Sequence, residues 1–240
     1  MTGRGSVRMN ITLSITLFSA TSRPAAAARI VTHFVHGRPL SVHGVNEGLL
    51  NTLASYLAHI EKAFPVAQDI RYDEITDMIR RNVLLGLGEE WVNRLSFLEE
   101  LRSLICDGRT TAIDGRMMPH EWFRTGYGYV KMDGVDHHAD QFFPGCQDIA
   151  WDIAGVLIEF SLDRKGQEYL VSRYGSSGNG SGVHERLPFY VVAYLAYRLG
   201  YTTFAADELG SSPDGVKFRA LVDRYTSLLK QEILRNTNRQ

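Results

Sequence analysis

Hydrophobic residues recur every three or four positions through most of the chain, which is the period of helices with one buried face. From Leu49 to Phe64 this spacing is regular, and Asn46 stands where it can cap the first turn. Gly86 and Gly88 interrupt the next periodic stretch. The same spacing predicts further helices over residues 72–85, 89–106, 149–162 and 216–234.

A different pattern marks the N-terminal region. Apolar residues alternate strictly with hydroxyl residues over residues 11–17, which is the period of a half-buried strand. A second strand is expected over 28–35, and short strands over 110–113 and 127–132. Together the patterns predict an α+β fold that is mainly α-helical, with a small β region near its centre and a rudimentary N-terminal β segment.

The first residues also fit another interpretation. Arg4 and Arg8 precede a modestly apolar stretch at 11–18, and small residues follow at 24–28. This combination is typical of a secretory signal over residues 1–28. The strict alternation of the apolar positions favours the strand, and both possibilities stay open.

Composition limits the classes of function. The chain has 240 residues, 44% of them hydrophobic, which is enough for a substantial core. With 26 basic and 27 acidic residues, it has no charge excess that would favour nucleic acid or an anionic membrane. Cys106 and Cys146 fit neither a disulfide framework nor a zinc site, so we expect free thiols in a reducing, cytoplasmic compartment. No apolar run is long enough to span a bilayer.

Candidate chemistry is concentrated between Asp114 and Leu162. Carboxylates are rare inside proteins unless they are paired, cap a helix or bind metal. Here they alternate with strand-like and helix-like apolar runs, which indicates a site held by a scaffold. The residues are Asp114, Glu121, Asp133, Asp136, Asp140, Asp148 and Asp152, with His120, His137 and His138.

Two short segments resemble a known family. Residues 145–155 (GCQDIAWDIAG) resemble the "G-D-P-x-x-D-L-A" segment of the aminoglycoside-phosphotransferase-like group of the protein-kinase-like fold. Residues 34–40 (FVHGRPL) resemble the hinge "F-x-x-G-x-x-L" that joins the small nucleotide-binding lobe of that group to its helical lobe. The resemblance implies a helical large lobe over residues 37–240. Residues 1–36 would be a remnant of the small β lobe or a leader.

The resemblance also implies ATP and Mg²⁺ as cofactors and a small metabolite with a hydroxyl or amine as substrate. The family's catalytic loop reads "H-G-D-x-x-x-x-N", in which the aspartate orients the acceptor hydroxyl and the asparagine holds magnesium. Asp114 would take the aspartate's role and Glu121 the metal role, with a spacing two residues longer than in the family. The second metal aspartate would be Asp136 or Asp133.

Three further residues would support this site. The resemblance implies that Asp152 is buried and accepts backbone N–H bonds from the loop 114–122. Asp148 is expected to cap the helix that begins at residue 149. His120 lies beside Glu121 within the same loop.

Other functions stay open. No glycine-rich phosphate loop or strand lysine precedes Phe34, so the chain is expected to be at best a poor kinase on its own. A non-catalytic kinase-like binding module is therefore the first alternative. The second is a metal-dependent phosphoesterase, because VDHH at 135–138 resembles the Asp-His-His signature of that family.

Overall fold

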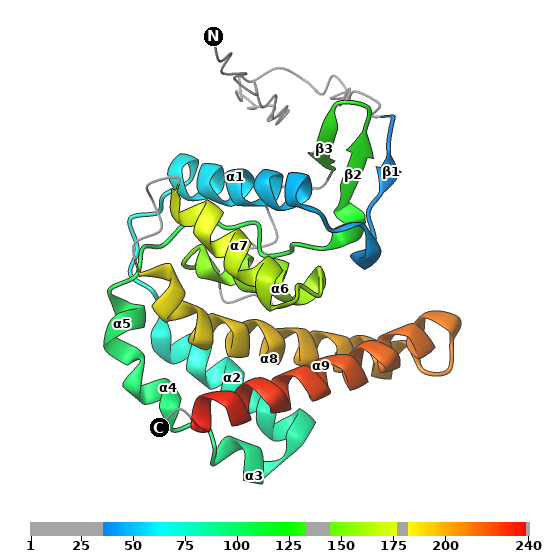
Figure 1. Cartoon of the computed structure of the whole chain (residues 1–240). Coiled ribbons are helices and arrows are strands. Elements are labelled where there is room, and N and C mark those ends of the chain that lie inside the picture. The colour runs from blue at the N-terminus through cyan, green and yellow to red at the C-terminus, as the bar shows by residue number, and fades with distance from the viewer. Residues whose placement is uncertain (1–35, 133–144, 177–181, 239–240) are drawn as a thin grey trace, which may run out of the picture.

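The computed structural model describes residues 36–132, 145–176 and 182–238, in which helices predominate and three short strands form one sheet (Figure 1). This confirms the α+β, mainly helical class. The strands are β1 (Arg38–Pro39), β2 (Trp122–Thr125) and β3 (Gly128–Lys131), and the 3₁₀ turns are η1 (Val42–Gly44) and η2 (Pro119–Glu121). The helices are α1 (Glu47–Ala63), α2 (Tyr72–Leu87), α3 (Glu89–Val92), α4 (Phe97–Glu100), α5 (Arg102–Cys106), α6 (Ala150–Glu159), α7 (Arg164–Tyr174), α8 (Val183–Leu209) and α9 (Pro213–Thr237).

Helix α1 follows directly from its sequence. The side chain of Asn46 accepts the N–H of Leu49 at 3.1 Å, so the predicted cap is confirmed. Glu47 in the first turn and Lys62 in the last also favour the helix dipole. Its apolar stripe is fully buried, including Leu49, Leu53, Leu57 and Ile60, each with no exposed surface.

The prediction of one continuous helix over residues 89–106 is wrong. It is divided into α3, α4 and α5, with the main break between Asn93 and Ser96. Leu95 and Phe97 are both buried. In a straight α-helix, residues two apart point about 200° away from each other, so one of these side chains would face solvent. The break turns both toward the core.

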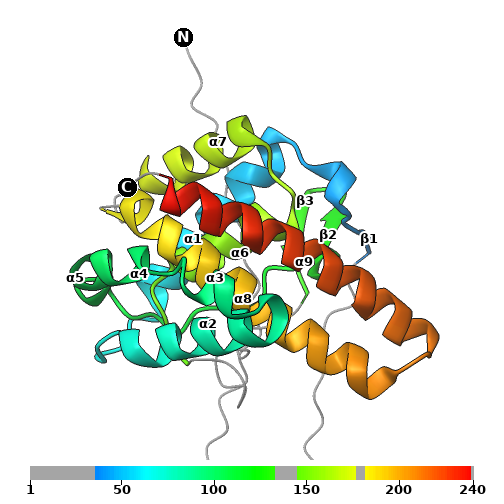
Figure 2. The ribbon, with the colours of Figure 1, turned by 90° about the horizontal axis from the view of Figure 1, so that it is seen from below.

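Helices α8 and α9 form a long antiparallel pair whose connecting end extends beyond the other elements (Figures 1 and 2). The apolar stretch 188–199 forms the middle of α8, which packs against α2, α6 and α9. The last predicted helix is confirmed as α9 and is slightly longer than expected. Helix α6 is shorter than the predicted 149–162 and is buried along most of its length.

The strands match their predictions in part. Residues 127–132 contain β3, which pairs antiparallel with β2, and β2 pairs antiparallel with β1. The strand predicted over 110–113 is wrong. Thr111 makes isolated bridges to Pro65 and Gln147 instead, so this segment connects two loops and joins no sheet.

The N-terminal strands over 11–17 and 28–35 lie outside the described residues, and the division of the chain near residue 36 stays a prediction. None of the helices in the described ranges combines the length and apolar character needed to cross a membrane. Cys106 and Cys146 are free thiols, as expected.

Candidate functional site

The segment from Asp114 to Glu121 is fixed at its start by Asp152 of α6. The two carboxylate oxygens of Asp152 accept the backbone N–H groups of Asp114 and Gly115, each at 2.8 Å. Asp152 has no exposed surface. Gly115 has a φ of 79°, in the left-handed region that favours glycine. The contact that the sequence analysis expected from Asp152 is therefore present, and it sets the path of the loop.

Asp114 is enclosed completely. Its side chain has no exposed surface, and Oδ2 accepts the hydroxyl of Tyr56, from α1, at 2.6 Å. Burial, followed by the nearby charge of Asp114, raises the pKa of Tyr56, so this hydroxyl stays protonated and donates a hydrogen bond to the carboxylate. Trp122 packs edge-on against Tyr56, with 5.2 Å between ring centroids, and closes the site on that side.

Lys131, at the end of β3, lies between two carboxylates. Its ammonium is 3.0 Å from Asp114 Oδ2 and 3.1 Å from Glu121 Oε2. Its side chain is only 5% exposed. Burial alone would lower the pKa of Lys131, but the charges of Asp114 and Glu121 outweigh it and raise that pKa. The cation that joins these two carboxylates is therefore the lysine.

This arrangement bears on the expected magnesium ion. Magnesium prefers octahedral oxygen ligands and keeps several waters. Asp114 Oδ2 and Glu121 Oε2 both contact the ammonium of Lys131. The other oxygen of Glu121, Oε1, pairs with Arg116 Nε at 2.8 Å. Within the described ranges no cluster of three or more His, Cys, Asp or Glu could hold a metal ion. The described residues therefore do not fit magnesium.

Asp133 and Asp136 lie outside the described residues, so the choice between them as a metal ligand stays a prediction. Asp148 Oδ1 accepts the N–H of Ala150 at 2.8 Å, and Oδ2 pairs with Arg186 at 2.9 Å. Helix α6 therefore begins one residue later than predicted, and Asp148 binds its first turn. Burial raises the pKa of Asp148, and Arg186 opposes that shift.

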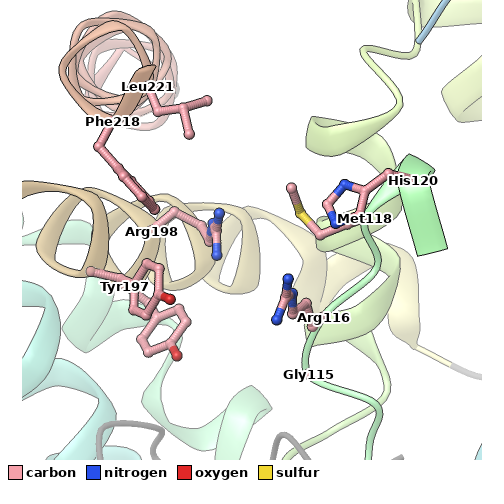
Figure 3. A pocket seen from close by; sticks show the side chains of 9 residues that line it. Gly115, Arg116, Met118, His120, Tyr197, Arg198, Phe218 and Leu221 are labelled. Carbon is pink, nitrogen blue, oxygen red and sulfur yellow. The ribbon is translucent and has the colours of Figure 1, made fainter. Parts of the chain in front are cut away.

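A cavity of about 190 Å³ lies between the loop and the α8–α9 pair (Figure 3). His120, expected to support the site, is exposed and lines this cavity. Arg116 from the loop and Arg198 from α8 also line it, and Figure 3 shows both guanidinium groups ending in the same open space. The remaining lining residues are Gly115, Met118, Tyr197, Tyr201, Phe218 and Leu221.

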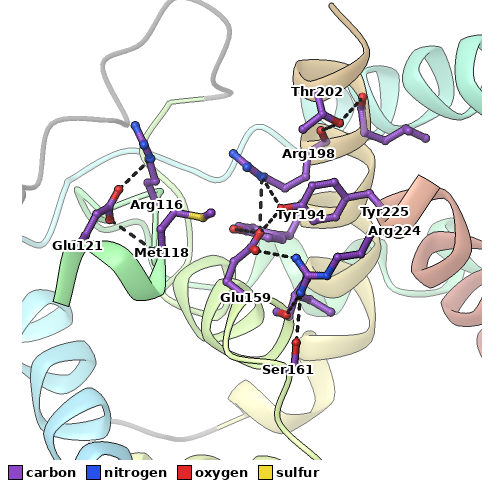
Figure 4. A network of polar contacts seen from close by, with 12 residues as sticks. Arg116, Met118, Glu121, Glu159, Ser161, Tyr194, Arg198, Thr202, Arg224 and Tyr225 are labelled. Carbon is purple, nitrogen blue, oxygen red and sulfur yellow. Dashed lines mark hydrogen bonds and ion pairs between the residues drawn. The ribbon is translucent and has the colours of Figure 1, made fainter. Parts of the chain in front are cut away.

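Behind the cavity, Glu159 of α6 collects several donors (Figure 4). Its Oε1 accepts the hydroxyls of Tyr194 at 2.9 Å and Tyr225 at 2.7 Å, and lies 3.5 Å from Arg198 Nε. Its Oε2 pairs with Arg224 at 3.1 Å. Glu159 is 2% exposed, so this network joins α6, α8 and α9 inside the protein.

Sequence reasoning did not single out Arg116, Arg198 or Glu159. For two of them a signal existed. Arg198 interrupts the apolar run of α8, and Glu159 interrupts that of α6. Charged residues within buried runs are usually paired, so the two could have been matched to each other. Arg116 has no such signal, because it lies in a polar loop.

No family model matches this sequence, and no curated protein matches it significantly. Solved structures do. The choline kinase LicA from Streptococcus pneumoniae is 16% identical with a TM-score of 0.55, over 82% of this chain and 66% of that protein. LicA in complex with AMP gives a TM-score of 0.56 at the same identity, over 81% of this chain and 66% of that protein. An ethanolamine kinase from Plasmodium vivax is 10% identical with a TM-score of 0.51, over 83% of this chain and 63% of that protein.

The chain therefore has the kinase-like fold of these small-molecule kinases, as the short motifs of the sequence implied. It spans about two thirds of the length of the solved kinases that it matches. At these identities the similarity establishes the fold, and the chemistry has to be argued from the residues of the site.

Proposed function

We propose that this protein binds a small metabolite in a kinase-like large lobe and transfers a phosphoryl group to it from ATP, slowly, in the cytoplasm. The observation that carries the proposal is the loop 114–121. Asp152 holds the start of this loop through two backbone bonds, and the loop opens on a cavity that a small molecule can enter. Phosphoryl transfer depends mainly on positioning and charge stabilisation, which a fixed loop beside a cavity supports.

The turnover is slow because of the state of Asp114. A residue that orients an acceptor hydroxyl must lie within hydrogen-bond reach of it, at roughly 2.6–3.2 Å. Tyr56 and Lys131 already contact the Asp114 carboxylate, which has no exposed surface. An acceptor would reach it only after the lysine moves. If magnesium binds, Glu121 with Asp133 or Asp136 would hold it.

A non-catalytic binding module is the second candidate, and one observation favours it. The charged side chain of Arg116 is one of the loop side chains that line the cavity, and it is 41% exposed. A guanidinium is always protonated and cannot act as a base toward a hydroxyl. The kinase-like fold gives no support to the phosphoesterase alternative, whose Asp-His-His stretch lies outside the described residues.

The test separates nucleotide binding from turnover. Thermal unfolding of the purified full chain is measured with and without magnesium and ATP, since a ligand at a hundred times its Kd stabilises by about 2.7 kcal/mol. ATP consumption is then followed with hydroxylated and amino-bearing metabolites, for the wild type, Asp114→Asn and the control Asp163→Asn.

Slow turnover that Asp114→Asn abolishes and Asp163→Asn retains supports the phosphotransferase. Binding without turnover supports the module. If ATP neither binds nor is consumed, the phosphotransferase proposal is wrong, and a binding module would not use ATP as its ligand.

A further inference from the structure

The cavity between the loop and the α8–α9 pair has an unusual charge distribution. Two arginines, Arg116 and Arg198, line it, and among the described residues around it there is no aspartate or glutamate. Their carboxylate partners are Glu121 and Glu159, which are 5% and 2% exposed and lie behind the cavity wall. The side of each arginine that faces the cavity is therefore cationic.

The contacts of the two guanidinium groups leave specific atoms available. Arg116 uses Nε toward Glu121, at 2.8 Å. Arg198 uses Nε toward Tyr225 at 3.2 Å and toward Glu159 at 3.5 Å. Among the contacts within the described part of the chain, the Nη amino groups of both have no hydrogen-bond acceptor, and Figure 3 shows them directed into the cavity. Each guanidinium can thus offer further N–H donors to a ligand.

Arg198 is also held in a fixed position. Its side chain is 9% exposed, and its guanidinium carbon lies 5.4 Å from the ring centre of Tyr201 and 5.3 Å from that of Tyr225. Aromatic faces attract cations and fix their orientation. Positioning this buried cation opposite a second one is unfavourable unless an anion or solvent lies between them.

From this geometry we propose that the cavity binds the oxyanion group of a small molecule, a phosphate or a carboxylate, between Arg116 and Arg198. Planar guanidinium groups bind such oxyanions with paired N–H bonds. The apolar part of the same molecule lies against Phe218, Leu221 and Met118. The cavity volume equals that of about six water molecules at roughly 30 Å³ each, which fits a small group only.

The proposal deepens the proposed function, because it assigns the charge of the small molecule. A cationic ligand such as choline would meet two guanidinium groups and, within the described part of the chain, no lining carboxylate. The expected ligand therefore differs in charge from choline, the compound named for the Streptococcus pneumoniae kinase of the same fold.

Calorimetric titration of the full chain without nucleotide tests this inference, with phenyl phosphate, inorganic phosphate, benzoate and choline as probes. Phenyl phosphate is expected to bind and choline is not. Benzoate and inorganic phosphate distinguish a carboxylate site from a phosphate site. This assay contains no ATP and so does not depend on turnover. Binding of phenyl phosphate would sustain this inference even if the ATP-consumption assay showed the phosphotransferase proposal to be wrong.

The variants are chosen to spare the fold. Arg116→Gln, at a half-exposed position, is expected to weaken phenyl phosphate at least tenfold, and Arg116→Lys to weaken it less. Leu221→Glu, which brings a carboxylate to the cavity, is expected to abolish binding. Arg164→Gln, at a side chain that is 92% exposed on α7, is the matched control and is expected to bind like the wild type. Tighter binding of choline than of phenyl phosphate, no binding of any oxyanion probe, or an unchanged affinity in Arg116→Gln would each overturn the proposal.

Discussion

Replacing Asp152 by alanine removes the acceptor that fixes the start of the loop 114–121. The substitution leaves the backbone N–H groups of Asp114 and Gly115 buried and without this acceptor; both now donate at 2.8 Å. A buried donor left unsatisfied costs about 1–3 kcal/mol, so the pair costs about 2–6 kcal/mol. Part of this returns, because burial and the charge of Asp114 raise the pKa of Asp152 and make its ionised form costly. We expect a net loss of about 2–4 kcal/mol in the free energy of unfolding.

Urea unfolding followed by circular dichroism measures this loss, and thermal unfolding provides a second readout. For a chain of this size about 1 kcal/mol corresponds to about 2–4 °C, so the Tm should fall by about 4–16 °C. Asp163→Ala is the matched control, because Asp163 also accepts one backbone N–H, from Gly166 at 2.8 Å, but is exposed. Its loss should be about 1 kcal/mol. If Asp152→Ala is no less stable than this control, the reasoning about the loop is refuted.

Three further outcomes are expected. Because the folded-state pKa of Asp152 is raised, the folded protein holds a proton that the unfolded chain releases near pH 4. The difference in unfolding free energy between the wild type and Asp152→Ala should therefore shrink as pH rises from 5 to 8. A difference that grows over this range would contradict the direction of the shift. Glu159→Gln should lose about 3–5 kcal/mol of unfolding free energy in urea, because Arg198 and Arg224 lose the carboxylate that both contact. The control Glu168→Gln, at an exposed ion pair, should lose under about 1 kcal/mol. Lys131→Met should likewise lose about 3–5 kcal/mol, because it removes the ammonium that lies between two buried carboxylates, and a loss no larger than that of the exposed Lys217→Met would argue against the bridge.

The parts of the fold that could be predicted are those that local pattern determines. Helix α1 has both a regular apolar stripe and a capping asparagine, so its start and its buried face follow from the sequence alone. The segment 89–106 has the same period and still breaks, because Leu95 and Phe97 both turn toward the core. That requirement comes from the packing of α2 and α8 nearby and leaves no mark in the local spacing.

The candidate site divides in the same way. The contact of Asp152 with the loop could be expected from a short motif, and the structure contains it. The position of Lys131 could not, because it depends on the register of β3 on β2, which pairs Lys131 with Trp122 beside Glu121. A sequence can suggest that a lysine is paired, but which carboxylates it contacts is decided by the register of the sheet.

The spacing of residues 114–121 also fits the family motif in a second alignment. In the motif "H-G-D-x-x-x-x-N" the glycine comes directly before the aspartate, and the asparagine follows the aspartate by five positions. If Gly115 stands for that glycine, Arg116 takes the position of the aspartate and Glu121 that of the asparagine, with no extra residues. Asp114 then takes the histidine's position, which fits its enclosed carboxylate, while Arg116 faces the cavity. We infer that, on this alignment, the loop presents a cation where the motif has a carboxylate. Through Arg116 such a loop can hold an anionic ligand but cannot accept a proton from one, which favours the binding module; turnover that Asp114→Asn abolishes would refute this alignment.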